Sequence, residues 1–227
     1  ASRNITPSET RQATGSASRT ETWSGVAKPS ASARTYSSNC HAAIPPAEEV
    51  RVEINTPPSA NPVSFAISPD GERIVFAATS EGQSRLWLRP LSAAAVRPLT
   101  GTDGASYPFW SPDSRSVGFF ADGKLKRIDV EAATVRDLAV ASFGTGGTWS
   151  RDGVILFVQG AGRPVVRVSD TGGDVATVTR IQAPGESNHR SPRFLPDGRG
   201  FLYFVTGTPE ARGVYAGSLD ATEPKRL

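Results

Sequence analysis

Three residues in two loops are the strongest candidates for chemistry in this sequence: His189, Arg190 and Asp103. His189 lies in the loop leading into the fourth repeat, beside Arg190, and its imidazole could contact a ligand. Asp103 lies in the corresponding loop of an earlier repeat and could share such a site. We therefore predict a binding site at these residues. The alternative is that His189 bonds the backbone of a neighbouring repeat and that Asp103 stabilises its own turn.

The sequence lacks the motifs of the common enzyme classes. It has no Gly-x-Ser-x-Gly nucleophile elbow for a hydrolase and no His-Arg-Asp or Asp-Phe-Gly motif for a kinase. The stretch Gly144-Thr145-Gly146-Gly147 resembles a phosphate-binding loop in composition, but no Gly-Lys-Ser/Thr follows it. We predict that the chain itself is not an enzyme, although a neighbouring domain of a longer protein could be one.

No metal or cofactor is expected. The pair Cys40-His41 lacks the ligand spacing of a zinc site. Four aspartates recur in similar surroundings, which suits turn formation better than metal binding. They are Asp70, Asp113, Asp152 and Asp197.

These aspartates mark a repeat that organises the chain. They lie in the sequences Ser68-Pro69-Asp70-Gly71, Ser111-Pro112-Asp113-Ser114, Ser150-Arg151-Asp152-Gly153 and Leu195-Pro196-Asp197-Gly198, and successive aspartates are 43, 39 and 45 residues apart. Proline presets φ, aspartate bonds locally and glycine accepts positive φ, so each copy predicts a tight hairpin turn. Ser114 stands at a glycine position and should be strained there.

Short β-rich runs flank every turn, and two more follow in each repeat. Four short antiparallel strands in roughly 40 residues form the blade of a β-propeller. We predict an all-β propeller with four visible blades, at about 61–100, 105–140, 143–182 and 188–227, as an incomplete ring with a leading strand at 50–55. An apolar residue stands three positions before each aspartate: Ile67, Trp110, Trp149 and Phe194. The three aromatic ones, Trp110, Trp149 and Phe194, should pack between blades.

The first 47 residues differ from the rest of the chain. They are rich in Ser, Thr, Ala and Arg without periodicity, which predicts a disordered low-complexity segment before a propeller at 48–227. The net charge of the 227 residues is only +3, so no clustered basic face for nucleic acid is expected. No apolar run is long enough to span a membrane, and no signal peptide is visible. The sequence leaves the oligomeric state open.

The turns, their spacing and the flanking strands resemble TolB-type, WD-repeat-like β-propellers over about residues 50–227. Three stretches are similar to the propellers attached to bacterial serine/threonine protein kinases: Arg85-Leu86-Trp87-Leu88-Arg89-Pro90-Leu91, the run from Pro108 to Lys126, and Gly147-Thr148-Trp149 with Asp152 to Phe157. This resemblance implies a sensing or scaffolding domain in a periplasmic or extracytoplasmic location.

Three functions remain open at this point. The first is a non-catalytic module that binds a protein or peptide, as part of a larger bacterial protein. The second is an accessory domain of an enzyme, either a serine/threonine kinase or a prolyl-oligopeptidase-like peptidase. The third is a sensor that binds a small ligand near His189 and Arg190.

Overall fold

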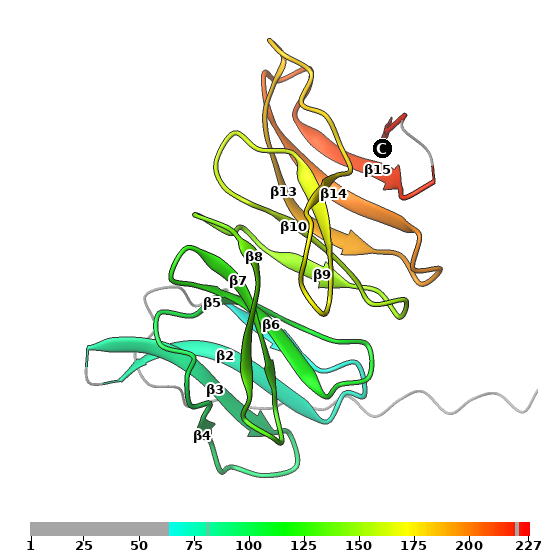
Figure 1. Cartoon of the computed structure of the whole chain (residues 1–227). Helices are drawn as coiled ribbons and strands as arrows, with labels where there is room; N and C mark the ends of the chain where they lie inside the picture. The colour runs from blue at the N-terminus through cyan, green and yellow to red at the C-terminus, as the bar shows by residue number, and fades with distance from the viewer. Residues whose placement is uncertain (1–63, 81, 221–222) are drawn as a thin grey trace, which may run out of the picture. The chain divides into compact units, whose positions relative to one another are not determined.

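The computed structural model describes residues 64–80, 82–220 and 223–227. All regular secondary structure in these residues is β, arranged as four antiparallel sheets of four strands each (Figure 1). Consecutive strands are neighbours in every sheet, so each sheet is a meander of hairpins. The predicted all-β propeller with four-stranded antiparallel blades is therefore confirmed, and the incomplete ring stays a prediction. The predicted segment 1–47 and the leading strand at 50–55 lie outside the described residues.

We name the four sheets blades A to D in chain order. Blade A consists of β1 (Phe65–Ile67), β2 (Arg73–Ser80), β3 (Gln83–Pro90) and β4 (Arg97–Pro98). Blade B consists of β5 (Ser106–Trp110), β6 (Ser116–Ala121), β7 (Lys124–Asp129) and β8 (Val135–Val140).

Blades C and D repeat this pattern. Blade C consists of β9 (Gly147–Trp149), β10 (Val154–Val158), β11 (Val165–Ser169) and β12 (Ala176–Thr177). Blade D consists of β13 (Glu186–Phe194), β14 (Gly200–Gly207), β15 (Gly213–Ser218) and β16 (Lys225–Arg226). Strand β13 begins two residues before the predicted start of its blade. Among the described residues, the structure contains no helix of the length and hydrophobicity that a membrane crossing requires.

Side chains that alternate along the second strand of a blade pack against different neighbours. In β10, Ile155 and Phe157 join the cluster shared with blade B, whereas Leu156 and Val158 join the cluster shared with blade D. All four are completely buried. Because successive side chains of a strand point to opposite faces, one strand supplies both interfaces. Burying an aliphatic or aromatic side chain of this size stabilises a fold by roughly 1.5–3 kcal/mol.

The apolar position before each turn lies at these interfaces in the later blades. Trp110 belongs to the cluster between blades A and B, and Trp149 to the cluster between blades B and C. Phe194 packs against the cluster between blades C and D. Ile67, in contrast, is 55% exposed. The predicted packing between blades thus holds for the three aromatic residues.

The repeated turn is held by the hydrogen bonds that its sequence predicts. In blade B the Ser111 hydroxyl donates to Asp113 Oδ1 at 2.6 Å, and the Arg115 N–H donates to the same oxygen at 3.0 Å. Burial opposes ionisation of Asp113, but these hydrogen bonds outweigh it and lower the pKa of the carboxyl. The same pair of contacts in blade A comes from Ser68 and the Glu72 N–H to Asp70.

Ser114 adopts the left-handed conformation that its position requires, with φ of 60°. Contacts from blade A hold it there. Its hydroxyl accepts the Asp70 N–H at 3.2 Å, and its carbonyl accepts a hydrogen bond from Arg73 at 2.7 Å. The Arg73 guanidinium also lies over the ring of Trp110, 5.4 Å from its centroid. The strained turn of blade B is therefore part of its interface with blade A.

Close packing around the Phe109 ring requires two glycines. A Cβ on Gly118 of β6 would lie 2.3 Å from Phe109 Cζ, and a Cβ on Gly147 of β9 would lie 2.5 Å from Phe109 Cε1. The ring therefore packs against bare backbone in its own blade and in the next one. Glycine at these positions is explained by the close approach of the ring rather than by backbone flexibility.

Replacing Gly118 by alanine should destabilise the fold by about 1–3 kcal/mol, because the Phe109 ring must move out of a well-packed core. The matched control is Gly160→Ala, since no atom lies within 4 Å of a Cβ at Gly160. That control is expected to change stability by less than about 0.5 kcal/mol. Urea unfolding followed by tryptophan fluorescence measures both. Equal stability of the two variants would show that the ring adapts freely.

The carboxyl of Asp70 should make stability depend on pH. The hydrogen bond from Ser68, followed by that from the Glu72 N–H, holds the pKa of Asp70 at about 2, below its ordinary value of 3.8. A pKa that is lower in the folded state stabilises the fold above pH 3.8, and this contribution is lost as the pH falls toward 2. Asp70→Asn should therefore flatten the acid dependence of the urea midpoint between pH 5 and pH 2. An unchanged dependence would contradict this assignment.

Candidate functional site

His189 lies on β13 with its side chain completely buried between blades C and D. Its Nδ1 is 2.7 Å from Thr179 Oγ1, and its Nε2 is 3.1 Å from Glu186 Oε2. Its ring packs on Tyr203 of β14 at a centroid distance of 4.9 Å. Its backbone N–H donates to the carbonyl of Arg163 in blade C at 3.3 Å. His189 therefore ties the inner strand of blade D to blade C.

The contacts of His189 form a directed chain of hydrogen bonds. The Thr179 hydroxyl accepts the Val165 N–H at 2.9 Å, so its own hydrogen is available to His189 Nδ1. An ionised carboxylate only accepts, so we assign the ring hydrogen to Nε2, which faces Glu186. The Gln182 N–H donates to the same Glu186 oxygen at 2.9 Å. Every polar atom of the imidazole thus has a partner inside the protein.

Burial also governs the neighbouring tyrosine. It raises the pKa of Tyr203 to about 12, and the negative charge of Glu186 adds to the shift. The phenol therefore stays protonated at neutral pH and serves as a packing partner for the imidazole. It is not a base at physiological pH.

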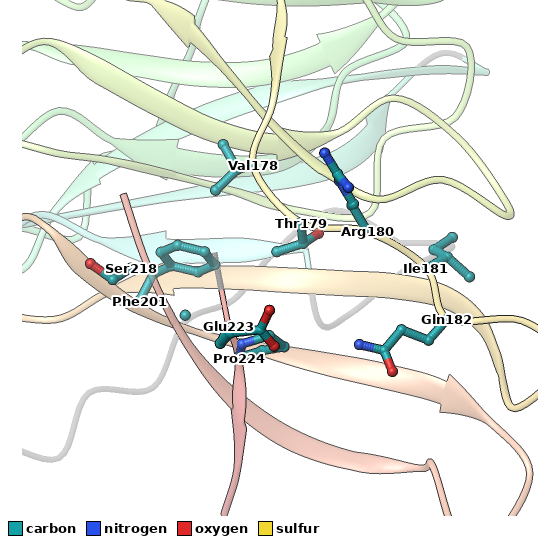
Figure 2. A pocket seen from close by; sticks show the side chains of 10 residues that line it. Val178, Thr179, Arg180, Ile181, Gln182, Phe201, Ser218, Glu223 and Pro224 are labelled. Atoms are coloured by element: carbon teal, nitrogen blue, oxygen red, sulfur yellow. The ribbon is translucent and has the colours of Figure 1, made fainter. Parts of the chain in front are cut away.

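A cavity of about 470 Å³ adjoins this network, and Thr179 belongs to both (Figure 2). Figure 2 shows the side chains of Glu223 and Pro224 across the cavity from Thr179, and that of Gln182 extending toward them. The walls combine apolar and polar groups, including Val178, Ile181, Phe201 and Ser218. A cavity of this size can hold a small molecule or a few residues of a peptide.

The other two predicted site residues lie apart from the His189 network. Arg190 follows His189 on β13, opposite Phe204, and its side chain is exposed. Asp103 is exposed after blade A and forms an ion pair with Arg85 at 3.2 Å. The structure thus gives Asp103 and His189 partners in different blades. A binding role for His189, Arg190 and Asp103 stays a prediction.

Sequence reasoning selected His189 but not its partners. Glu186 lies three residues earlier on the same strand, and in a regular strand the two side chains would point to opposite faces. The pairing of β13 with β14 shifts in register between Glu186 and Asn188, which brings the two groups together. Thr179 lies after the last strand of blade C, and nothing in the neighbouring sequence indicates that it contacts His189. A bulge and a contact between blades cannot be read from residue types.

A second set of cavities lies where the inner strands of the four blades meet. Strand β5 contacts both β1 and β9, and β9 contacts β13. One cavity of about 410 Å³ and one of about 200 Å³ are each lined by residues of all four blades. We call the two together the axial opening. Within residues 64–80, 82–220 and 223–227, no three His, Cys, Asp or Glu side chains lie close enough to hold a metal ion.

The comparison with curated proteins finds one informative relative. The chain is 31% identical over 139 residues to a protein of Bacillus subtilis named uncharacterized peptidase YuxL. The match covers 60% of this chain but only 20% of that protein. The chain therefore corresponds to about a fifth of the length of this relative. No family model matches the sequence.

Solved structures with a similar fold include TolB from Acinetobacter baumannii, with a TM-score of 0.61, 18% identity, and coverage of 73% of this chain and 43% of that one. A putative TolB from Agrobacterium tumefaciens has a TM-score of 0.61, 20% identity, and coverage of 72% and 63%. Puromycin hydrolase has a TM-score of 0.54, 17% identity, and coverage of 71% and 28%. At these identities the likeness shows the fold, which is that of a TolB-like propeller.

The prediction that the chain is not an enzyme is wrong by these comparisons. It rested on the absence of hydrolase and kinase motifs from 227 residues. The curated relative is named as a peptidase, and the structural neighbours include a hydrolase. The match covers only a fifth of this relative. The absence of catalytic motifs from such a stretch is therefore no evidence against an enzyme. The comparisons point toward an enzyme.

Thr179→Val should destabilise the fold by about 1–3 kcal/mol, because it leaves the Val165 N–H and His189 Nδ1 buried without a partner at nearly constant side-chain volume. Thr179→Ser keeps the hydroxyl and is the matched control, with a smaller loss from the missing methyl group. Urea unfolding gives both values. If the valine variant is as stable as the serine variant, the hydroxyl does not hold the interface of blades C and D.

Proposed function

We propose that this chain is part of the propeller of a peptidase, in which the blades bind a protein or peptide. The observation that carries the proposal is the 31% identity over 139 residues to a protein named as a peptidase. The fold adds support, because puromycin hydrolase contains a region of the same architecture.

The surface of the axial opening suits the binding of a peptide. Phe65 and Ile67 of β1 are 50% and 55% exposed, and Leu195 is 37% exposed. Each of these residues lines one of the two axial cavities. Exposed apolar side chains that gather around a hollow commonly mark an interaction site. The rigid blades hold this surface in place, as expected of binding residues on a stable scaffold.

The other functions are less well supported. The kinase-attached propellers of the sequence analysis have no counterpart among the relatives and structures reported above, so that link stays a prediction of the resemblance. A periplasmic or extracytoplasmic location is likewise a prediction of the resemblance. A small-ligand sensor is supported by the cavity beside Thr179, although His189 itself has no exposed surface.

A fluorophosphonate probe tests the peptidase part of the proposal, because it labels activated serine nucleophiles covalently. The native protein is captured from its source organism with an antibody raised against residues 64–227, treated with the probe, and separated by size. We expect a labelled band that contains these blades and loses its label after heat denaturation. Unlabelled native protein would contradict a peptidase with a serine nucleophile, such as the prolyl-oligopeptidase-like peptidase of the sequence analysis, whether or not the blades bind peptides.

A further inference from the structure

The larger axial cavity is lined by the same positions of the repeat in all four blades, which makes departures from the repeat visible. The second residue of each turn lines it, and this residue is Pro69, Pro112, Arg151 or Pro196. The residue before the apolar position also lines it, and here the four blades supply Ala66, Phe109, Thr148 and Arg193. Each position thus carries an arginine in one blade, where the other three blades have uncharged residues.

These two arginines make the axial opening positive. No acidic residue lines either axial cavity within the described part of the chain. Both arginine side chains are exposed, and neither forms an ion pair with a described residue. Arg193 lines both cavities, so its positive charge acts in the larger and in the smaller one. Like charges gathered in a hollow attract an anionic ligand.

The smaller cavity contains an independent sign of a missing partner. Thr145 lines it and is only 4% exposed, and its Oγ1 has no hydrogen-bond partner among the described residues. The next residue, Gly146, has φ of 111°, and its N–H makes no hydrogen bond to a described residue either. Buried polar groups are normally paired, and an unpaired one is costly. The Thr145 hydroxyl is therefore a buried group without a partner among the described residues, and the N–H of the partly buried Gly146 beside it is also unpaired.

We propose that the axial opening binds the C-terminal carboxylate of a peptide whose last residues are apolar. The carboxylate pairs with Arg193 and accepts hydrogen bonds from the Thr145 hydroxyl and the Gly146 N–H. The apolar side chains lie against the exposed Phe65 and Ile67 at the mouth of the opening. A cavity of about 200 Å³ accommodates the end of a chain better than a segment that passes through. This inference rests on the peptide binding of the proposed function.

Isothermal titration of the full chain with the tetrapeptide acetyl-Ala-Ala-Leu-Phe tests the inference. The free acid should bind, and its C-terminal amide should bind about tenfold or more weakly, because the amide removes the charge that Arg193 recognises. Acetyl-Ala-Glu-Leu-Phe-amide, which carries its carboxylate on an internal side chain, should not recover the affinity. Titration with trigalacturonic acid tests whether the opening binds an acidic sugar instead of a peptide.

The repeat supplies variants that should fold. Arg151→Pro and Arg193→Thr install the residues that other blades carry at the same positions, and each should weaken binding of the free acid. The control is Arg136→Gln, which removes an exposed charge on β8 that lines neither axial cavity. Thr145→Val should weaken binding without loss of stability, since it removes a hydroxyl that has no partner in the free protein.

Besides an absence of binding by the free acid, three results would overturn the inference. They are equal affinity for the acid and the amide, equal effects of Arg193→Thr and Arg136→Gln, and binding of trigalacturonic acid without binding of the peptide. Each of these leaves the fluorophosphonate result untouched, so a failed carboxylate site and a failed peptidase assignment can be told apart. If the free acid does not bind at millimolar concentration, the site is absent even if the native protein is labelled.

Discussion

The second strand of each interior blade packs against both neighbouring blades, and the rest of the structure depends on this two-sided packing. In β6, Val117 and Phe119 bury against blade A, while Phe120 buries toward blade C. In β10 the alternation continues toward blades B and D. A single four-stranded sheet cannot cover both of its faces, so each blade depends on a neighbouring blade for its core. The turns, inner strands and cavities keep their positions because the second strands fix the spacing of the blades.

The sequence predicts whatever is local to one blade. The turn residues, their period and the short β-rich runs are sufficient to predict four antiparallel meanders, and the hydrogen bonds of Ser111 and Asp113 follow from their types and spacing. Even the positive φ of Ser114 follows from its place in the repeat. What holds that serine does not follow, since the Asp70 N–H and the Arg73 side chain reach it from another blade. Contacts between repeats depend on how the blades are placed, which one repeat does not encode.

The candidate sites illustrate the same limit. His189 is a rare residue type here and is easily noticed, but its burial and its bonds to Thr179 and Glu186 depend on a bulge in β13 and on the surface of blade C. For the axial opening, the residues are easy to find in the sequence but their role is not. Its arginines are visible in the sequence as imperfections of the repeat, yet their meaning appears only when the four inner strands converge and bring equivalent positions to one cavity. By residue type alone, His189 is the first candidate for a binding site. In the structure, however, the axial opening is the candidate with exposed charges that lack an ion pair.

Departures from the repeat can be sorted by what compensates them. Ser114 costs backbone strain, and two hydrogen bonds with blade A offset that cost, so the departure belongs to the packing of the fold. Arg151 and Arg193 gain no ion pair with a described residue, and Thr145 has a hydroxyl without a described partner. The exposed arginine charges contribute little to folding, whereas the buried Thr145 hydroxyl without a partner is unfavourable for it. Their concentration at the axis of the repeat is the reason to look there for a ligand, because a bound carboxylate supplies the compensation that the blades do not.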